Sequence, residues 1–516
     1  MRTIVLAFAL AMLTPLASQA DDVAAKIAGL RIERLRPLDF APFAKDMAAF
    51  QPPAELDAFL LSAGIADIQS AMAAGELTSE MLTLWHLARI QRLDDGLRGM
   101  LEINPATLDD ARAADARRAG GQSLGTLDGI PITLKDNIGT AGLMHTTANA
   151  EILLDRVAKG DAELVASLRA AGAVIIGKAS LSEFAGSFAT GYPSGGNGAV
   201  GGQGVNPLGP WPTYGSSSGS AISVAAHFSV VSIGTETAGS LVSPAGVMSL
   251  VGMKPSAGLV STEGVVPLIA SNDGPGPIAR TVQDAALLLA AADTAEVDYA
   301  AGLSADALTG VRVGVLLADI ADAGMGTEAI TRTAAAFVLL GADTAPVTLD
   351  VPLDVIQQFF TYLSAGMRYD MMPVVSAHNP AVVTLEDLIA YNKEDPKRRM
   401  PFGQDMLEKF APMTAELSAA DYAKLTADMH RVMTEAIDAA FAAHGGVEVL
   451  VSMANLHSVF YATAGYPAIT VPIGRKDSGE PVGVTLIGKK GQDAQLLSYA
   501  YAFEQATRAH IPPDLP

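Results

Sequence analysis

Apolar and polar positions follow two different periods along this chain. Residues 54–98 and 164–171 repeat apolar side chains at helical spacing. The run Ala173-Val174-Ile175-Ile176-Gly177 follows at once and is short, continuous and β-branched, which predicts a buried strand. A helix closed by glycine and followed directly by a strand is typical of a layered α/β fold with a partly parallel sheet.

The second half of the chain continues this alternation. Residues 311–317 predict a strand and residues 328–340 a helix, and strand-like runs return at 447–451, 468–471 and 482–487. Residues 353–443 are mostly helical with polar faces and carry no chemical motif, so we expect a cap or a substrate wall. No fixed repeat and no low-complexity linker divides the chain. The pattern therefore predicts one continuous α/β core with a helical insertion.

The first twenty residues differ from the rest. Arg2 precedes an apolar run over residues 4–13, Pro15 interrupts it, and Ser18 and Ala20 occupy the positions that a signal peptidase reads. This predicts a cleaved export signal and a periplasmic or secreted protein; an uncleaved anchor or a buried helix is the alternative. The run is shorter than the about 20 residues of a membrane-spanning helix. No later stretch is an unbroken apolar span, so we expect no stable membrane span.

These patterns divide the chain into five segments. We expect a signal peptide over 1–20, an N-terminal arm with helices over 21–120, a core over 121–300, a strand plus helical insertion or cap over 301–445, and the C-terminal part of the core over 446–516.

Composition narrows the chemistry. The 516 residues are 50% apolar, enough for a large core, and the absence of cysteine excludes thiol nucleophiles, thiolate metal sites and disulfides. A formal net charge of −21 argues against a nucleic-acid partner, which would need clustered Lys and Arg. The histidines are scattered without metal-binding spacing, so we expect no metal and no cofactor.

Two serine–glycine clusters interrupt apolar sequence. They are Gly215-Ser216-Ser217-Ser218-Gly219-Ser220 and Gly234-Thr235-Glu236-Thr237-Ala238-Gly239-Ser240. Such clusters are commonly flexible loops, but residues 221–231 between them look like a buried helix or strand. Glycines that let a ligand approach the backbone are therefore the better interpretation.

Lys135 is the third candidate, because it ends the apolar run Ile130-Pro131-Ile132-Thr133-Leu134. A lysine at a strand end is usually a solvated cap. A lysine held in apolar surroundings, however, has a lowered pKa and can act as a base.

Taken together, these motifs make the chain resemble the amidase signature family from about Ala54 to the C-terminus. The matching stretches also include Gly129-x-Pro131-x-x-x-Lys135-Asp136-Asn137, Gly276-Pro277-Ile278-Ala279-Arg280-Thr281 and Gly465-Tyr466-Pro467-Ala468. The resemblance implies the amidase signature fold, one large mixed β-sheet core surrounded by helices. It also implies hydrolysis of a carboxamide C–N bond.

The resemblance further implies a role for each motif. Lys135 is the base, Ser216, held by a cis peptide bond, is the bridging serine, and Ser240 is the nucleophile that forms an acyl-enzyme. The oxyanion hole is made by the backbone N–H groups of Thr237, Ala238, Gly239 and Ser240. Supporting positions are Gly215, Ser217 and Asp136.

Three positions depart from the family pattern. Glu236, Ala238 and Val242 stand where many family members have Asp, Gly and Arg. That arginine often pairs with the acid, and Val242 cannot, which leaves open how the nucleophile loop is stiffened. Ala238 also leaves less room above the oxyanion hole.

The Gly-Ser-Ser-Ser-Gly-Ser and Gly-Thr-Glu-Thr variants, the export signal and residues 399–404 are similar to the peptide amidase branch, which releases ammonia from C-terminal peptide amides. The alternative substrates within the family are aryl or alkyl amides and carbamates. We expect the pocket walls to come from residues 144–150, the loop around Tyr192 and the helical insertion, with His145 and His457 as candidate lining residues. The sequence indicates no particular oligomeric state.

Two further interpretations stay open. An α/β-hydrolase would use Ser217, at the centre of Gly215-x-Ser217-x-Gly219, with His444 or His457. The proline-rich residues 207–212 do not suit the strand that this motif needs. A non-enzymatic periplasmic binding protein would suit the export signal and the acidic charge. The formal Gly-x-Gly-x-x-Gly over residues 196–201 lacks a flanking strand and helix, so we expect a loop near the active-site mouth.

Overall fold

The computed structural model describes residues 31–516 apart from 187, 190–194, 294, 296 and 317–326. The export signal expected over residues 1–20 and the loop around Tyr192 lie outside the described residues.

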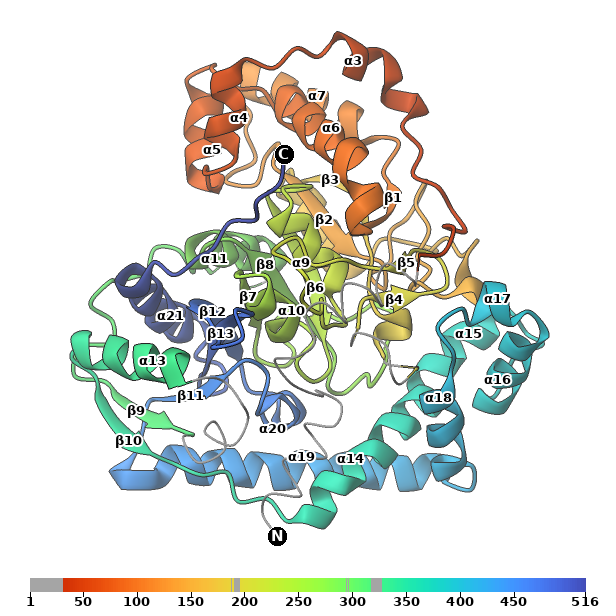
Figure 1. Cartoon of the computed structure of the whole chain (residues 1–516), viewed down its shortest axis with the longest axis vertical. Coiled ribbons are helices and arrows are strands. Elements are labelled where there is room, and N and C mark those ends of the chain that lie inside the picture. The colour runs from red at the N-terminus through yellow and green to blue at the C-terminus, as the bar shows by residue number, and fades with distance from the viewer. Residues whose placement is uncertain (1–30, 187, 190–194, 294, 296, 317–326) are drawn as a thin grey trace.

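Within the described part of the chain, eleven strands form one mixed sheet at the centre of the molecule (Figure 1). Their order is β1-β3-β2-β6-β8-β7-β12-β13-β11-β9-β10. Strand β2 runs parallel to β3 and β6, and β9 runs parallel to β10 and β11, whereas the other pairs are antiparallel. The bounds are β1 Met100–Ile103, β2 Pro131–Lys135, β3 Val174–Ala179, β6 Val231–Glu236, β7 Val251–Lys254, β8 Gly274–Ala279, β9 Arg312–Val315, β10 Asp343–Pro346, β11 Val449–Met453, β12 Ala468–Arg475 and β13 Pro481–Ile487. The predicted mixed sheet is confirmed.

Both faces of this sheet are buried, which explains the continuous apolar runs in the sequence. In β3, Ile175 packs in one hydrophobic cluster with helices α8, α11 and α21, and Ile176 packs in another with α6, α9 and α10. Successive side chains of a strand point to opposite faces, so a strand covered on both sides is apolar at every position. The bounds are α6 Ser79–Leu97, α8 Glu163–Ala170, α9 Ser218–Ala225, α10 Val242–Val247, α11 Val282–Ala292 and α21 Asp493–Thr507.

The N-terminal helices gather at one end of the sheet, at the top of Figure 1. Residues 54–98, predicted as helical, form three helices, α4, α5 and α6. The remaining bounds here are η1 Ala41–Phe43, α3 Ala44–Ala49, α4 Ala54–Leu60, α5 Ile65–Ala73 and α7 Thr107–Ala119.

The predicted helical insertion is confirmed between β10 and β11, and it lies along the lower edge of Figure 1. We call residues 353–442 the cap. Its elements are α14 Leu353–Gly366, the π-helical turn η4 Met367–Met371, α15 Met372–His378, α16 Leu385–Glu394, α17 Pro396–Arg399, α18 Asp405–Phe410, η5 Ala411–Thr414 and α19 Ala419–Ala442. Shorter or flanking elements are η2 Glu151–Leu153, η3 Glu183–Ala185, α13 Thr327–Leu339, η6 Ala443–Gly445, α20 Ser458–Ala464, and the hairpin of β4 Asn197–Gly198 and β5 Gly202–Gln203.

Two features of the sheet differ from the sequence pattern. Strand β8 contains Pro275 and Pro277, residues that argue against a central strand, yet it pairs with both β6 and β7. Residues 221–231, readable as helix or strand, divide into the end of α9 and the start of β6. No helix in the described ranges combines the length and apolar character needed to cross a membrane.

Candidate active site

Lys135 ends strand β2, between β3 and β6 in the sheet, and its side chain is fully buried. Its Nζ lies 2.8 Å from Ser216 Oγ, 2.8 Å from Thr235 Oγ1 and 3.0 Å from the Thr235 carbonyl oxygen. Burial lowers the pKa of Lys135 to about 7, against the opposing charges of Asp273 and Glu236. A large share of this amine is therefore uncharged near neutral pH.

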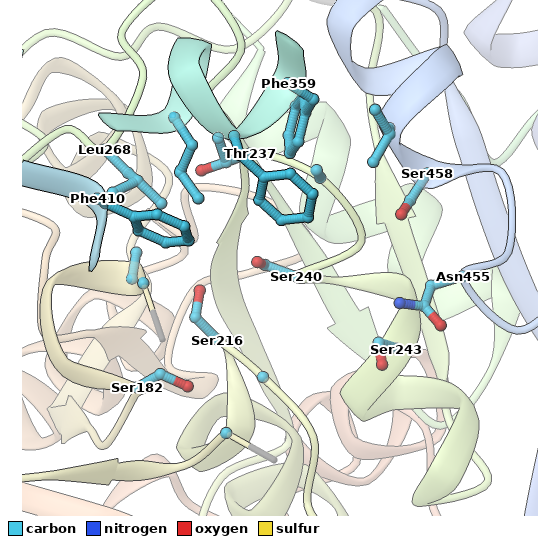
Figure 2. Close-up of a pocket in the computed structure, with 18 of the residues that line it drawn as sticks. Ser182, Ser216, Thr237, Ser240, Ser243, Leu268, Phe359, Phe410, Asn455 and Ser458 are labelled. Carbon is cyan, nitrogen blue, oxygen red and sulfur yellow. The ribbon is translucent and has the colours of Figure 1, made fainter. Parts of the chain in front are cut away.

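Ser216 and Ser240 line one cavity. The Gly215–Ser216 peptide bond is cis, as the resemblance implies. The Ser217 N–H donates to the Ser240 carbonyl oxygen at 3.1 Å, which joins the two serine loops. Figure 2 shows both hydroxyls directed into the same part of the cavity. The structure thus brings Lys135, Ser216 and Ser240 into one site.

The loop from Thr237 to Ser240 follows strand β6 and borders this cavity through Thr237, Ala238 and Ser240. No described residue accepts a hydrogen bond from the amides of Ala238, Gly239 or Ser240. Gly239 has a φ of 90°, and a Cβ there would lie 2.8 Å from Ser458 Oγ. Glycine is therefore required by a left-handed backbone and a close approach, and the loop presents its amides without a side chain in the way.

Glu236 holds the nucleophile loop in place although Val242 cannot pair with it as an arginine would. Its buried carboxylate accepts hydrogen bonds from the amides of Leu241 and Val242, at 2.7 and 3.2 Å. Tyr461 lies against it, and burial together with this carboxylate raises the pKa of the Tyr461 phenol. The residues that directly follow Ser240 are thus held by a buried acid without an arginine.

Ser217 has a structural place in the site. Its Oγ donates to the Thr235 carbonyl oxygen at 2.9 Å and accepts from the Thr235 amide at 3.2 Å. No strand lies directly before it in the described chain, since the nearest one, β5, ends at Gln203. His444 bonds the Pro346 carbonyl and His457 bonds Ser452. The α/β-hydrolase interpretation is therefore wrong, since Ser217 fastens α9 to β6.

Asp136 is fastened by a buried ion pair. Its carboxylate lies 3.0 Å from Lys178 Nζ, and both side chains are almost fully buried. It also accepts hydrogen bonds from the amide of Thr147, at 2.9 Å, and from the Thr147 hydroxyl. The segment after Lys135 is thus tied to strand β3, on which Lys178 lies.

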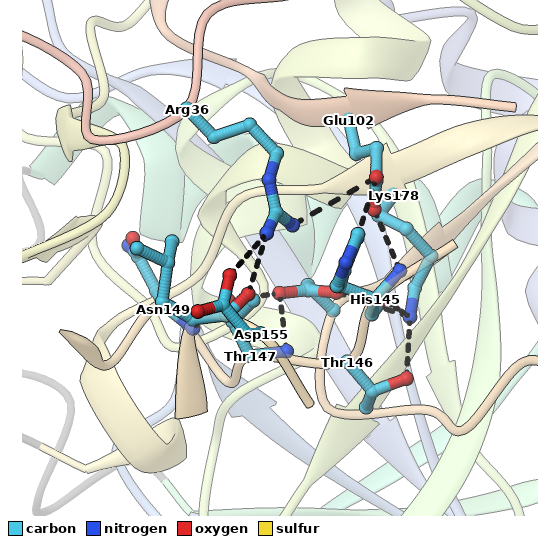
Figure 3. Close-up of polar contacts among 10 residues, drawn as sticks. Arg36, Glu102, His145, Thr146, Thr147, Asn149, Asp155 and Lys178 are labelled. Carbon is cyan, nitrogen blue, oxygen red and sulfur yellow. Dashed lines mark hydrogen bonds and ion pairs between the residues drawn. The ribbon is translucent and has the colours of Figure 1, made fainter. Parts of the chain in front are cut away.

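Around this pair, a polar network extends to the protein surface (Figure 3). Lys178 also donates to the His145 carbonyl at 3.0 Å, and the His145 ring contacts Glu102 at 2.8 Å. Arg36, from the N-terminal arm, contacts Glu102 and Asp155. The arm is therefore fastened to Glu102 on strand β1 and to Asp155 in the loop after η2.

The cavity has a volume of about 420 Å³ and two unlike walls. Figure 2 shows Ser182, Ser216 and Ser243 at the lower side and Phe359 and Phe410 at the upper side. The apolar wall consists of Leu268, Leu353, Ile356, Phe359, Phe360, Leu363, Phe410, Met413 and Val459. Most of these belong to the cap, as predicted.

Other expected walls are wrong. Residues 144–150, His145 and His457 do not line the cavity. Residues 145–147 instead hydrogen-bond Lys178 and Asp136 (Figure 3). The Gly-x-Gly-x-x-Gly segment contains part of the β4–β5 hairpin, and the adjoining Gly195 borders the cavity. No three His, Asp or Glu side chains converge as metal ligands in the part of the chain that the structure describes.

Three polar residues at the site were not predicted to act there. Thr235 supplies two of the three oxygens around Lys135 Nζ, and Asn137 Nδ2 donates to Thr235 Oγ1 at 3.1 Å. Asp273 accepts a hydrogen bond from the Thr237 hydroxyl. Thr235 and Asn137 stand inside the conspicuous motifs, so their polar character at strand ends was a usable signal. Asp273 lies 36 residues from Thr237 in the sequence, so no local pattern pointed to their contact.

Comparison with known proteins places this geometry in a family. A sequence model of the Amidase family matches residues 81–456 and 446–497. The crystal structure of native peptide amidase from Stenotrophomonas maltophilia is 38% identical, and the match covers 88% of this chain and 98% of that chain with a TM-score of 0.79. An amidase family protein from Bacillus anthracis is 30% identical, with 96% and 98% covered and a TM-score of 0.81.

Two curated relatives match most of the chain as well. A probable amidase of Arabidopsis thaliana is 34% identical over 490 residues, which cover 87% of this chain and 91% of that protein. A glutamyl-tRNA(Gln) amidotransferase component of Myxococcus xanthus is 32% identical, with 85% and 96% covered.

Lys178→Met should destabilise the fold strongly. It leaves the Asp136 carboxylate buried without its cation, and removal of one partner of a buried pair costs about 3–5 kcal/mol. Urea unfolding should show a fall of that size in the free energy of unfolding, and adding Asp136→Asn should recover part of it. Lys424→Met, in an exposed pair with Asp428, is the control and should change little. A Lys178 variant as stable as the control would contradict the buried pair.

Proposed function

This chain belongs to the amidase signature family of amide-hydrolysing enzymes, and we propose that it hydrolyses C-terminal peptide amides through an acyl-enzyme on Ser240. An enzyme was expected from the sequence, and the interpretation as a binding protein is wrong. The proposed mechanism rests on one observation above all. A buried amine with a pKa lowered to about 7 lies 2.8 Å from a serine hydroxyl that borders the same cavity as Ser240.

The hydrogen bonds around Lys135 favour a role as base. A neutral amine has two N–H groups and one lone pair. The carbonyl and hydroxyl oxygens of Thr235 can accept the two N–H groups, at 3.0 and 2.8 Å. The lone pair then faces Ser216, so Lys135 can accept the Ser216 proton while Ser216 takes the proton of Ser240.

Acylation follows from this relay. Ser240 Oγ bonds to the amide carbon, and the negative charge on the carbonyl oxygen is stabilised by the amides of residues 237–240. The proton returns through Ser216 to the departing nitrogen, the C–N bond breaks, and ammonia leaves an ester on Ser240. Water then loses a proton to the same relay and attacks the ester. The acid departs and Ser240 regains its proton.

The substrate proposal is supported by the similarity to peptide amidase and by the two walls of the cavity. The apolar cap wall suits amino-acid side chains next to the reacting amide. Beside this wall, Asn455 and Ser458 offer polar side chains that can hydrogen-bond a peptide backbone (Figure 2).

A substrate panel tests this proposal. The purified chain is assayed with N-acyl dipeptide amides, anilides, carbamates and free glutamine, while ammonia or amine release is followed. We expect kcat/KM for the peptide amides to exceed the others by about tenfold or more, which corresponds to about 1.4 kcal/mol of transition-state binding. A higher kcat/KM for anilides or carbamates would reassign the substrate class, and preferred release from glutamine would point to an amidotransferase-like role.

Substitutions test the relay itself. Lys135→Ala and Ser240→Ala should each lower kcat by at least about 10³-fold, as for residues that act as one unit. Ser240→Ala should also abolish labelling by a fluorophosphonate probe. Ser218→Ala is the matched control, because its buried hydroxyl has no hydrogen-bond partner among the described residues, and kcat should stay within about twofold. Full activity of Lys135→Ala would refute the assigned base.

The pH dependence follows from Lys135. The ammonium form has no lone pair for the Ser216 proton, so kcat/KM should rise with pH as the amine titrates, with an apparent pKa of about 7. Initial rates from about pH 5 to about pH 9 would measure this limb, with circular dichroism as the control for folding. An optimum at clearly acidic pH in folded enzyme would exclude a neutral-lysine mechanism.

A further inference from the structure

We propose that Asp273 is a positioning residue for this reaction, whose carboxylate orients Thr237 in the oxyanion loop and joins that loop to the cap. The inference rests on the proposed acyl-enzyme mechanism but not on the identity of the amide substrate. The sequence motifs that indicate the relay do not include this residue.

The register of the sheet places Asp273 opposite Thr237. Strands β6 and β8 are antiparallel, and Glu236, the last residue of β6, pairs with Gly274, the first residue of β8. The residue after β6 and the residue before β8 therefore face each other. The Thr237 hydroxyl donates to Asp273 Oδ1, and the amide of Leu268 donates to Oδ2 at 2.8 Å. Both carboxylate oxygens are thus engaged, one by the oxyanion loop and one by the cavity wall.

The contact matters because Thr237 belongs to the loop that stabilises the oxyanion. Its side chain borders the cavity, and a fixed hydroxyl restricts its χ1 angle and limits movement of the adjoining peptide planes. Oxyanion donors contribute most when they are held in place before the charge develops, and the loss of one donor costs about 10²–10³-fold in kcat. A carboxylate that fixes Thr237 therefore acts on the rate through geometry.

Asp273 also stands at the junction with the cap. The turn before it, residues 268–272, is held by cap side chains: Asp370 accepts from the Ala270 amide at 2.8 Å, and the Tyr362 hydroxyl donates to Asn272 Oδ1 at 2.9 Å. Tyr422 of α19 in turn donates to Asp370 at 2.6 Å. The cap is thereby connected to the oxyanion loop through a single short turn that ends at Asp273.

The charge of Asp273 provides a readout that packing alone would not change. Asp273 and Glu236 are the two carboxylates that raise the pKa of Lys135 against the effect of burial. Burial raises the pKa of Asp273 itself to about 6; Lys135 and the hydrogen bonds from Thr237 and Leu268 lower it, and Asp370 raises it. The ionised Asp273 carboxylate favours the charged form of Lys135. Neutralising Asp273 should lower the pKa of Lys135 and move the rising limb of the rate profile to lower pH.

The test compares Asp273→Asn with two further variants. Asp273→Asn should lower kcat by about 10-fold to 100-fold with little change in KM. It should also move the rising limb by about 0.5 unit or more to lower pH. Thr237→Val keeps the branched shape but loses the hydroxyl, and kcat should fall similarly. Asp370→Asn removes a charge from the cap side of the same turn, and it should leave the rising limb at its wild-type position.

Several outcomes would overturn the inference. One is that Asp273→Asn keeps the wild-type kcat and the wild-type position of the rising limb of its pH profile. Another is that Asp370→Asn shifts this limb as far as Asp273→Asn does. If Asp273→Asn does not fold by circular dichroism, Thr237→Val decides, and wild-type kcat there rejects the positioning role. The rate of Ser240 labelling by a fluorophosphonate, measured across pH in every variant, separates this test from the substrate proposal. Labelling that follows the expected order without peptide amide hydrolysis would reject only the substrate.

Discussion

The site depends on keeping one amine out of water. Two lysines at the ends of neighbouring parallel strands are both fully buried, but their surroundings differ. Lys178 lies 3.0 Å from the Asp136 carboxylate, whereas the oxygens nearest to Lys135 Nζ are uncharged and belong to Ser216 and Thr235. Burial lowers the pKa of both lysines, but only at Lys178 does a contacting carboxylate oppose this shift. Lys178 is thus held in an ion pair, whereas Lys135 is left for the role of base in the proposed mechanism.

The hydrogen bonds of Glu236 explain why position 242, close to Ser240, can depart from the family pattern. Glu236 is satisfied by the backbone amides of Leu241 and Val242, so the loop gains its stiffness from charge-assisted hydrogen bonds. Position 242 is then free to be apolar, and Val242 packs in the hydrophobic cluster that the cap residues form. An arginine there would place a second charge in this cluster. Val242 instead places the start of α10 in the same hydrophobic cluster as the cap residues.

Local patterns predicted the strands made of β-branched runs and drew attention to the segments that contain Lys135, Ser216 and Ser240, because these signals lie within a few residues. The roles of the three residues came from the resemblance to the amidase signature family. The local patterns missed β8, since its alternating glycines and prolines hide a pairing that only its neighbours specify. They misplaced residues 144–150, which follow Lys135 closely in sequence but do not line the cavity, since this segment is bonded to Asp136 and Lys178. Contacts such as Thr237 with Asp273 depend on strand register, which the sequence does not state.

The two walls of the cavity have separate origins, and this separation has a consequence for specificity. The reacting groups stand at strand ends and on loops fixed to the sheet, whereas the apolar wall comes mainly from α14, α18 and η5 of the cap. Changes in Phe359 or Phe410 can therefore alter which side chain fits without touching Lys135 or its oxygen partners. The turn before Asp273 is one of the places where the cap meets the core. In the proposed reaction, a substrate that packs against the apolar wall would contact Leu268, whose amide donates to Asp273. Asp273 in turn accepts from Thr237, so the wall and the proposed oxyanion loop share one carboxylate.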